Sequence, residues 1–259
     1  MLCSQRSLKT GFLNVDGLNE VSREDVSDTI KLKKIDVVFI VESKRREEEI
    51  GIDISIPGYA VHEAKRSNLA EDKDGGGLVC YTKLGDGLLF QRHTPNIDDP
   101  GASFVNNERM WIKVESQKCK TAICRLYLGC QYSDDRNSSW NEKIYRVVQQ
   151  EAFVLRSQGY RVVYLGDFNG HIGCLPGVGV PNNTPKINPN GRRFLNFLEI
   201  TDSRHINGEC RVPGDLSTML TKGLWTRQRA GFSSVIDYGV VSSEHINSVV
   251  SMEIDDNGV

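Results

Sequence analysis

Short apolar runs, each bounded by Gly, Asp, Asn or Pro, recur along the chain and constrain its fold more than any other feature. The runs VVFIV, VVYL and VIDYGVV are almost wholly β-branched or aromatic, which is typical of strands covered on both faces. The run ICRLYLG alternates more and indicates a strand with one more polar face. We therefore expect strands at Thr10–Val15, Asp36–Val41, Gly77–Tyr81, Met110–Val114, Thr121–Leu128, Arg161–Leu165 and Ser234–Val241.

Helical periodicity is found in fewer segments. The spacing of apolar residues predicts helices at Ser22–Lys34, Ser139–Ser157 and Arg192–Ile200. Ser22 and Asp25 form a weak capping box for the first helix, and Asn190-Gly191 is expected to begin the third. Many strands with a few interspersed helices favour an α/β (α+β) fold, in which two sheets pack face to face with helices outside.

Composition limits the domain number and the classes of partner. The chain has 259 residues and no linker-like break, so we expect a single domain over residues 1–259. A net charge of −2 means that a phosphate-bearing partner must be held by a local basic patch. Seven cysteines without a CxxC pair predict buried free thiols in a reducing compartment. Because no apolar stretch has the length of a signal peptide or membrane span, we expect an intracellular protein, nuclear or cytoplasmic.

The segment YLGDFNGHIG places polar groups at the end of an apolar run. Asp167 and Asn169 are two residues apart, so in an extended segment both side chains project to the same side. A carboxylate that activates water, beside an amide that donates to a phosphoryl oxygen, suits hydrolysis of a phosphate ester. For this segment alone, the alternative is a turn in which both side chains bind their own backbone.

Similar polar groups end other predicted strands. FLNVDGL places Asn14 and Asp16 at the end of the first strand, and VVFIVES places Glu42 at the end of the second. A carboxylate there is costly unless it is partnered, and Asp16 with Glu42 could share a hard divalent ion such as Mg²⁺. In SSVIDYGVV, Asp237 lies within an apolar strand and needs a polar partner. Caps and strand edges could explain each residue alone, but their coincidence favours a phosphate-hydrolysing site.

These motifs, in this order, resemble the endonuclease/exonuclease/phosphatase (DNase I-like) superfamily, and the resemblance runs from Thr10 to Ser243. GGGLVCYTK, ERMWIKV, GDFNGHIG and NPNGRRFLNFL are most similar to the endonuclease domains of LINE-type (non-LTR) retrotransposons. NVDGL is equally similar to abasic-site endonucleases. The resemblance implies a four-layered sandwich of two mostly antiparallel sheets flanked by helices. It also implies a Mg²⁺- or Mn²⁺-dependent hydrolase that acts on phosphodiester bonds of DNA.

The resemblance further implies the roles of individual residues. The catalytic residues would be Asn14, Glu42, Tyr132, Asp167, Asn169 and Asp237. Glu42 would be the main metal ligand, with Asp16 as a second candidate. Asp167 would orient or deprotonate the attacking water, and Asn169 would bind the phosphate. Asp237 would hold the imidazole of a catalytic histidine.

Two further groups of residues would contact DNA. Tyr132, in CQYSDD, would contact the scissile phosphate, and Tyr127 remains the alternative because the usual Tyr-x-Pro context is absent. Backbone contacts or bracing of the site would come from Lys222, Thr226, Arg227 and Ser234.

The catalytic histidine of the family lies in a Ser-Asp-His segment on the last strand, whereas this sequence ends in SMEIDDNGV. We therefore expect a C-terminally truncated domain that lacks its last strand. His171 follows GDFN and His245 lies too early, so neither is expected to replace the missing imidazole. Loss of such a group costs at least ~10²–10⁴-fold in rate, which predicts impaired activity.

The leading hypothesis from the sequence is thus a monomeric endonuclease domain of a LINE-type retroelement, fused to or partnered with a reverse transcriptase. It would nick target DNA without binding a membrane. One alternative is an abasic-site repair endonuclease or another phosphodiesterase of the same fold. A second alternative is a non-catalytic remnant that only binds nucleic acid.

Overall fold

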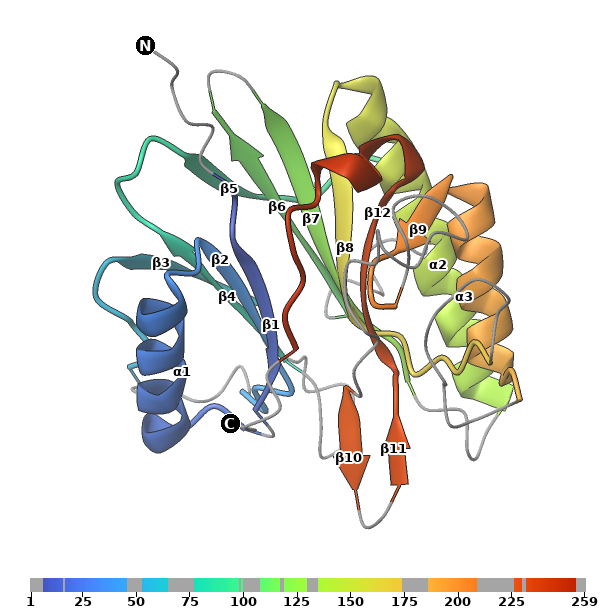
Figure 1. The fold of residues 1–259 in the computed structure, drawn as a ribbon, viewed down its shortest axis with the longest axis horizontal. Coiled ribbons are helices and arrows are strands. Elements are labelled where there is room, and N and C mark those ends of the chain that lie inside the picture. The colour runs from blue at the N-terminus through green and yellow to red at the C-terminus, as the bar shows by residue number, and fades with distance from the viewer. Residues whose placement is uncertain are drawn as a thin grey trace.

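A computed structural model of the chain describes residues 7–15, 17–45, 53–64, 77–97, 99, 108–116, 119–129, 135–173, 186–208, 226–229 and 232–254. These residues form two sheets that pack face to face, with helices on both outer sides (Figure 1). The fold therefore has the layer order helix, sheet, sheet, helices, and the predicted α/β sandwich is confirmed.

The first sheet consists of β1 (Thr10–Asn14), β2 (Val37–Val41), β3 (Tyr59–Ala64) and β4 (Leu78–Lys83), in the order β1-β2-β4-β3. Strands β1 and β2 are parallel, and the other neighbours are antiparallel. Helix α1 (Glu20–Lys33) covers the outer face (Figure 1), where Val26 and Ile30 pack in one apolar cluster with Val38 and Ile40 of β2.

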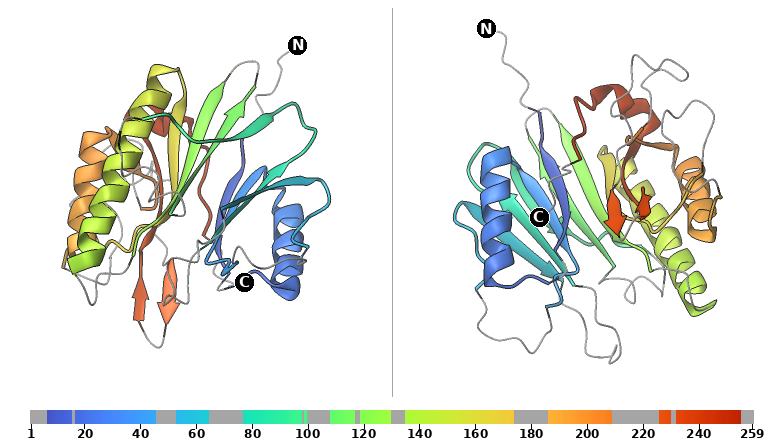
Figure 2. Two further views of the ribbon diagram at one scale, coloured as in Figure 1. Left: turned by 180° about the vertical axis from the view of Figure 1, so that it is seen from behind. Right: turned by 60° about the horizontal axis from the view of Figure 1, so that its bottom comes forward.

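The second sheet has the strand order β5-β6-β7-β8-β12-β9. Its strands are β5 (Leu89–His93), β6 (Arg109–Glu115), β7 (Lys120–Tyr127), β8 (Arg161–Asp167), β9 (Ser203–His205) and β12 (Asp237–Ser242). Helices α2 (Asp135–Ser157) and α3 (Pro189–Ile200) cover its outer face, as Figure 2 shows from behind. A separate hairpin of β10 (Arg227–Arg229) and β11 (Phe232–Ser234) precedes β12, and a 3₁₀ helix, η3 (Ser243–Ser248), follows it.

Alternation along β7 determines which side chains face each layer. Ile123 packs between the two sheets in a cluster with Phe39 of β2, whereas Cys124 packs toward α2 and α3. Because side chains two residues apart share a face, Arg125 and Tyr127 also point between the sheets. The inter-sheet layer is therefore apolar in its centre and becomes polar where β7 ends.

The connections bring several strand ends to one edge. The parallel pairs β1–β2 and β7–β8 are each joined by a helix, because parallel strands need a crossover. Strand β12 runs antiparallel to β8, so its first residue lies opposite the last residue of β8. The ends of β7 and β8 and the start of β12 therefore meet.

The central strands agree with the sequence prediction, and the missed ones lie at edges. Strand β3 ends the first sheet, and β5 and β9 are the two edges of the second. Residues at an edge need less apolar cover, and the β5 sequence LFQRH is largely exposed. Strand β10 was also missed. The predicted strand Ser234–Val241 is divided, because β11 ends at Ser234 and β12 begins at Asp237.

All three helix starts also differ from the prediction, and helix α2 begins at Asp135 rather than at Ser139. Helix α1 begins earlier because Asn19 is its N-cap; the Asn19 side chain accepts from the Ser22 N–H, and the Ser22 hydroxyl accepts from the Asn19 N–H. Helix α3 begins at Pro189 with Asn188 as N-cap, rather than at Asn190. Helices α1, α2 and α3 thus begin two, four and three residues earlier than apolar periodicity alone indicates.

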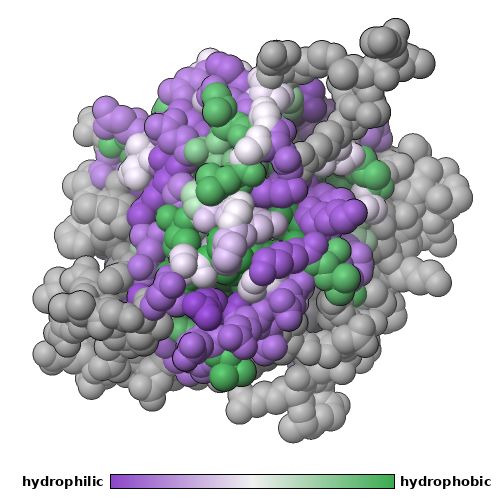
Figure 3. Space-filling model, turned by 90° about the vertical axis from the view of Figure 1, so that its left-hand side faces the viewer, coloured by the Kyte–Doolittle hydropathy of each residue, from purple (hydrophilic) through white to green (hydrophobic). Residues whose placement is uncertain are grey.

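The outer face over the first sheet carries mainly hydrophilic side chains with scattered apolar ones (Figure 3). In the described part of the chain, every helix is too short or too polar to cross a bilayer. The predicted last-strand truncation stays a prediction, since residues 255–259 lie outside the described ranges.

Candidate active site

A tyrosine and two carboxylates lie side by side across three strands of the second sheet. Tyr127 at the end of β7 is the register partner of Asp167 in β8, and Asp167 is the partner of Asp237 in β12. Register partners place their side chains on the same face of a sheet, about 5 Å apart. This Tyr127–Asp167–Asp237 row faces the first sheet.

Glu42 joins the row from the opposite sheet. It follows β2 directly, and its carboxylate Oε1 accepts a hydrogen bond of 3.4 Å from the Tyr127 hydroxyl. The backbone φ of Glu42 is +51°, in the left-handed region that a residue with a Cβ rarely adopts. Such conformations are held by their surroundings and are concentrated at functional sites. The two sheets thus contribute to one polar cluster.

Asp167 is the most strongly perturbed acid of this cluster. Its side chain is buried, and the whole residue is 6% exposed. Burial first, and then the negative charge of Asp237, raise the pKa of Asp167 well above its usual range. A hydrogen bond of 2.8 Å from the Asn169 N–H to Oδ1 and the charge of Arg125 act in the opposite direction. A carboxylate with a raised pKa is a better proton acceptor near neutral pH.

Asn169 is held firmly in the loop after β8. Its φ is +45°, and its Nδ2 donates 2.7 Å to the carbonyl oxygen of Leu128, which follows β7. Its own carbonyl accepts from Asn188 Nδ2 at 3.1 Å. The alternative is correct for Asp167, which binds the backbone of its own turn, but not for Asn169, whose side chain binds the backbone of Leu128. The same bonds hold these two residues at the strand edge.

Asn188 is a residue that sequence reasoning missed. Its Oδ1 accepts from the N–H groups of His171 (3.0 Å) and Gly191 (2.6 Å). A Cβ on Gly191 would collide with the His171 carbonyl, so glycine is needed for this close approach. Asn188 therefore connects the N-terminus of α3 to the loop that carries Asn169. The polar segment NPNG before an apolar helix was the signal that could have indicated it.

The residue before Asp167, Gly166, has no room for a side chain. It lies between Leu126 of β7 and Tyr238 of β12, and a Cβ there would collide with the Leu126 carbonyl. Any larger residue would push β8 away from β7 and separate Tyr127 from Asp167.

Thr226 braces the start of β12. Its Oγ1 accepts from the N–H groups of Ile236 (3.0 Å) and Asp237 (3.1 Å), which fixes the backbone that carries Asp237. Arg227 and Ser234 are register partners in the β10–β11 hairpin. Figure 1 shows this hairpin projecting beside the start of β12. Lys222 lies outside the described residues.

The remaining predicted site residues lie beside the cluster or outside the described residues. Asn14 ends β1 opposite Val41, so it lies one position from Glu42 in the neighbouring strand, and its side chain is exposed. Asp16 and Tyr132 lie outside the described residues. Tyr127 lies beside Asp167 and Glu42, and the choice between the two tyrosines stays open because Tyr132 lies outside the described residues.

The donor set at this edge suits a hard divalent cation. Mg²⁺ is usually held by one or two carboxylates and completes its shell with water and substrate phosphates. Glu42 supplies one such oxygen ligand, and the mutual repulsion of Asp167 and Asp237 would be relieved by a positive charge. No group of three or more His, Cys, Asp or Glu side chains among the described residues is arranged to hold an ion by itself. Among the described residues, the site therefore offers at most part of a ligand set for such a cation.

The histidines lie in other parts of the fold. His62 is on β3 and contacts the Thr82 hydroxyl at 3.0 Å, and His93 is on β5. His205 on β9 contacts the Asn207 carbonyl at 3.2 Å. His245 lies in η3, and the His171 backbone binds Asn188.

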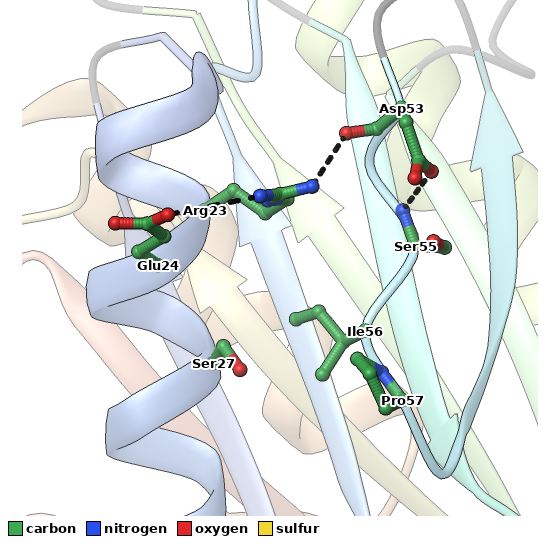
Figure 4. A pocket seen from close by; sticks show the side chains of 7 residues that line it. All are labelled: Arg23, Glu24, Ser27, Asp53, Ser55, Ile56 and Pro57. Atoms are coloured by element: carbon green, nitrogen blue, oxygen red, sulfur yellow. Dashed lines mark hydrogen bonds and ion pairs between the residues drawn. The ribbon is translucent and has the colours of Figure 1, made fainter.

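A pocket of about 230 Å³ lies on the opposite side of the first sheet, between α1 and residues 53–57 (Figure 4). Arg23 spans it by donating 3.1 Å to the Asp53 carbonyl. Since the carboxylate cluster lies between the two sheets, this pocket on the outer side of the first sheet is separate from the candidate site. Its lining residues are Arg23, Glu24, Ser27, Asp53, Ser55, Ile56 and Pro57.

Comparisons with known proteins identify the fold. No protein-family model and no curated protein sequence matches the chain. Among solved structures, the AP endonuclease LMAP from Leishmania major superposes with a TM-score of 0.70 at 15% identity, over 94% of this chain and 81% of that one. The catalytic domain of Xenopus laevis APE2 gives 0.61 at 16%, over 93% and 84%. The endonuclease domain of TRAS1, a telomere-specific non-LTR retrotransposon, gives 0.57 at 11%, over 93% and 88%. The chain therefore has the fold that these endonuclease structures share, the predicted DNase I-like α/β sandwich.

Proposed function

We propose that the chain is a Mg²⁺- or Mn²⁺-dependent phosphodiesterase that nicks DNA, as the endonuclease domain of a LINE-type retroelement. The observation that carries the proposal is the convergence of Glu42 with the Tyr127–Asp167–Asp237 row. Three groups suit phosphodiester hydrolysis: the Asp167 carboxylate with its raised pKa, the Glu42 carboxylate from the first sheet as a metal ligand, and the Tyr127 hydroxyl beside both.

In the proposed reaction, each residue acts on the water or on the phosphate. Asp167 accepts a proton from the attacking water, and its bond from the Asn169 N–H keeps the carboxylate in place. When substrate binds, the Tyr127 hydroxyl turns its single proton from Glu42 to a phosphate oxygen, and the side-chain amide of Asn169 donates to another. Glu42, with Asp16 as second candidate, would hold the cation, which would supply positive charge beside the phosphate and the leaving oxygen. The products are 5′-phosphate and 3′-hydroxyl ends.

The retroelement role rests on sequence motifs and on one structural likeness. GGGLVCYTK, GDFNGHIG and NPNGRRFLNFL resemble the retrotransposon branch, and the TRAS1 endonuclease has the same fold. In such an element, the 3′-hydroxyl would prime a partner reverse transcriptase. Cleavage of intact duplex DNA to polymerase-extendable 3′ ends tests this role, and 3′ ends that a polymerase cannot extend would contradict it.

An abasic-site endonuclease is the second candidate, because LMAP, an AP endonuclease, has a TM-score of 0.70. Matched duplexes with and without one abasic site distinguish the two. Equal cleavage of both duplexes supports the retroelement role, whereas at least ~10-fold faster cleavage of the abasic duplex supports repair. DNA binding without cleavage of either duplex would instead select the non-catalytic remnant.

A further inference from the structure

Arg125 is a buried cation within the inter-sheet layer, just behind the candidate site. It is 1% exposed and lies on β7 between Met110 of β6 and Leu165 of β8, both of which pack in the inter-sheet apolar cluster. Tyr127 is two residues further along the same face of β7. Arg125 thus occupies the row directly inside the Tyr127–Asp167–Asp237 row.

The guanidinium of Arg125 is poorly satisfied by the fold. Within the described ranges, neither its Nε nor its Nη1 has a hydrogen-bond partner. Burial lowers the pKa of Arg125 to about 10, so the group still carries its charge at neutral pH. Burying an incompletely paired charge destabilises the folded state, and an apolar side chain of similar volume would pack this position better.

Arg109 shows what a structural buried arginine looks like in the same sheet. It lies on the neighbouring strand β6, and its Nε and Nη2 donate to the two oxygens of Glu151 at 2.7 and 2.5 Å. Trp111 Nε1 completes this buried group by donating to Glu151 at 2.8 Å. Arg125 has no comparable ion pair within hydrogen-bond distance among the described residues.

The charge of Arg125 acts on the residues of the candidate site. Its Cζ lies 5.4 Å from the centre of the Tyr127 ring, within the range of a cation–π contact. Its charge also favours the ionised form of Asp167, against the effects of burial and of Asp237. Among the acidic neighbours of Arg125, Glu108 before β6 raises its pKa most, followed by Asp167. Arg125 therefore acts on two residues that the proposed reaction uses: it contacts the ring of Tyr127, and its charge acts on Asp167.

We propose that Arg125 is a positioning residue of the nuclease site. From its place in the inter-sheet layer, it orients the Tyr127 ring and balances the negative charge of Asp167 and Asp237. This inference rests on the proposed function. It explains why an arginine that destabilises the fold occupies an otherwise apolar layer.

The test compares Arg125→Met with the matched control Arg109→Met, using thermal unfolding and DNA nicking. Arg125→Met should keep or raise the melting temperature, since it removes a poorly paired charge. Arg109→Met leaves Glu151 unpaired and should lower the melting temperature by roughly 5–20 °C. Below its melting temperature, Arg109→Met should nick at the wild-type rate per folded molecule. Arg125→Met should lower kcat by at least ~10-fold with little change in KM, and Arg125→Lys should restore part of the loss.

Each result supports or overturns the inference. A melting temperature that falls as far in Arg125→Met as in Arg109→Met would show a structural role and overturn it. Unchanged nicking by a stable Arg125→Met would overturn it while leaving the proposed function intact. If the wild-type protein does not nick DNA, the proposed function fails. The role of Arg125 is then tested by comparing the Mn²⁺ affinity of Arg125→Met with that of the wild-type protein. Loss of the buried charge should tighten Mn²⁺ binding at least ~3-fold, and unchanged affinity would overturn the inference.

Discussion

Asp167 and Asp237 are directly opposite each other on the antiparallel strands β8 and β12, with the side chain of Asp167 buried. Two like charges placed this closely raise the free energy of the folded state unless one is protonated or a cation is bound. Tyr127 and Glu42 adjoin the same pair from β7 and from the first sheet. This arrangement costs stability and is therefore best explained by function.

Asp167→Asn should stabilise the protein while abolishing nicking. The folded-state pKa of Asp167 is raised, so the folded state binds its proton more tightly than the unfolded chain, and wild-type stability falls as pH rises through that range. Asparagine removes this penalty and can still accept from the Asn169 N–H. We expect a gain of roughly 0.5–2 kcal/mol at pH 7, and none below the unfolded-state pKa of about 4. Thermal unfolding from pH 3 to pH 8 measures it; equal destabilisation at every pH would contradict the assignment.

Asp237→Asn should shift the pH dependence of the residual nicking. Removing the neighbouring negative charge lowers the pKa of Asp167, so the acidic limb of the rate profile should move to lower pH. The position of the limb, rather than the height of the profile, is the quantity to compare with wild type. An unmoved limb would show that Asp167 is not the titrating group.

Tyr127→Phe and Tyr132→Phe distinguish the two candidate tyrosines. Loss of the Tyr127 hydroxyl removes the 3.4 Å bond to Glu42 and a donor to the phosphate, which should lower kcat by ~10²-fold. Tyr132→Phe should leave kcat within about 3-fold of wild type. The reverse pattern would return the role to Tyr132.

Asn188→Asp separates capping from positioning. Aspartate still accepts from the N–H groups of His171 and Gly191, but it cannot donate to the Asn169 carbonyl. We expect near-wild-type stability with lower kcat, whereas Asn188→Ala should also lose about 1 kcal/mol of stability.

The N-cap of α1 provides the control for this prediction. Asn19→Ala removes the equivalent cap on the other side of the molecule and should cost about the same stability without changing kcat. If Asn19→Ala and Asn188→Ala reduce nicking equally, the effect of Asn188 is general destabilisation.

The central strands were predictable because they are buried on both faces, so β2 and β8 appear as nearly unbroken apolar runs. The edge strands were not, since β3 and β5 carry too few apolar residues to be distinguished from loops. Glu42 and Asp167 were noticed because each ends an apolar run, and Asp237 because it interrupts one, although it begins β12 rather than lying inside a strand.

Other features depend on register, which a single sequence does not specify. Tyr127 is aligned with Asp167 only through the parallel pairing of β7 with β8. The sequence does not reveal that Arg125 lacks hydrogen bonds at Nε and Nη1 whereas Arg109 binds Glu151 through Nε and Nη2, since each is one arginine in an apolar run. The bonds of Asn188 to His171 and Asn169 likewise depend on the path of the loop after β8.

The most direct measurement is single-turnover nicking of supercoiled plasmid with protein in excess, comparing wild type with Glu42→Gln and Asp167→Asn. In Glu42→Gln, the side-chain oxygen can still accept a hydrogen bond from the Tyr127 hydroxyl, but it binds Mg²⁺ poorly. The matched control is Glu244→Gln, a substitution of the same kind at an exposed position. The proposed function predicts Mg²⁺-dependent nicking by wild type and Glu244→Gln that EDTA abolishes, with losses of at least ~10²-fold in both site variants. Nicking that persists in both site variants, or that is absent from wild type at every Mg²⁺ and Mn²⁺ concentration, would contradict it.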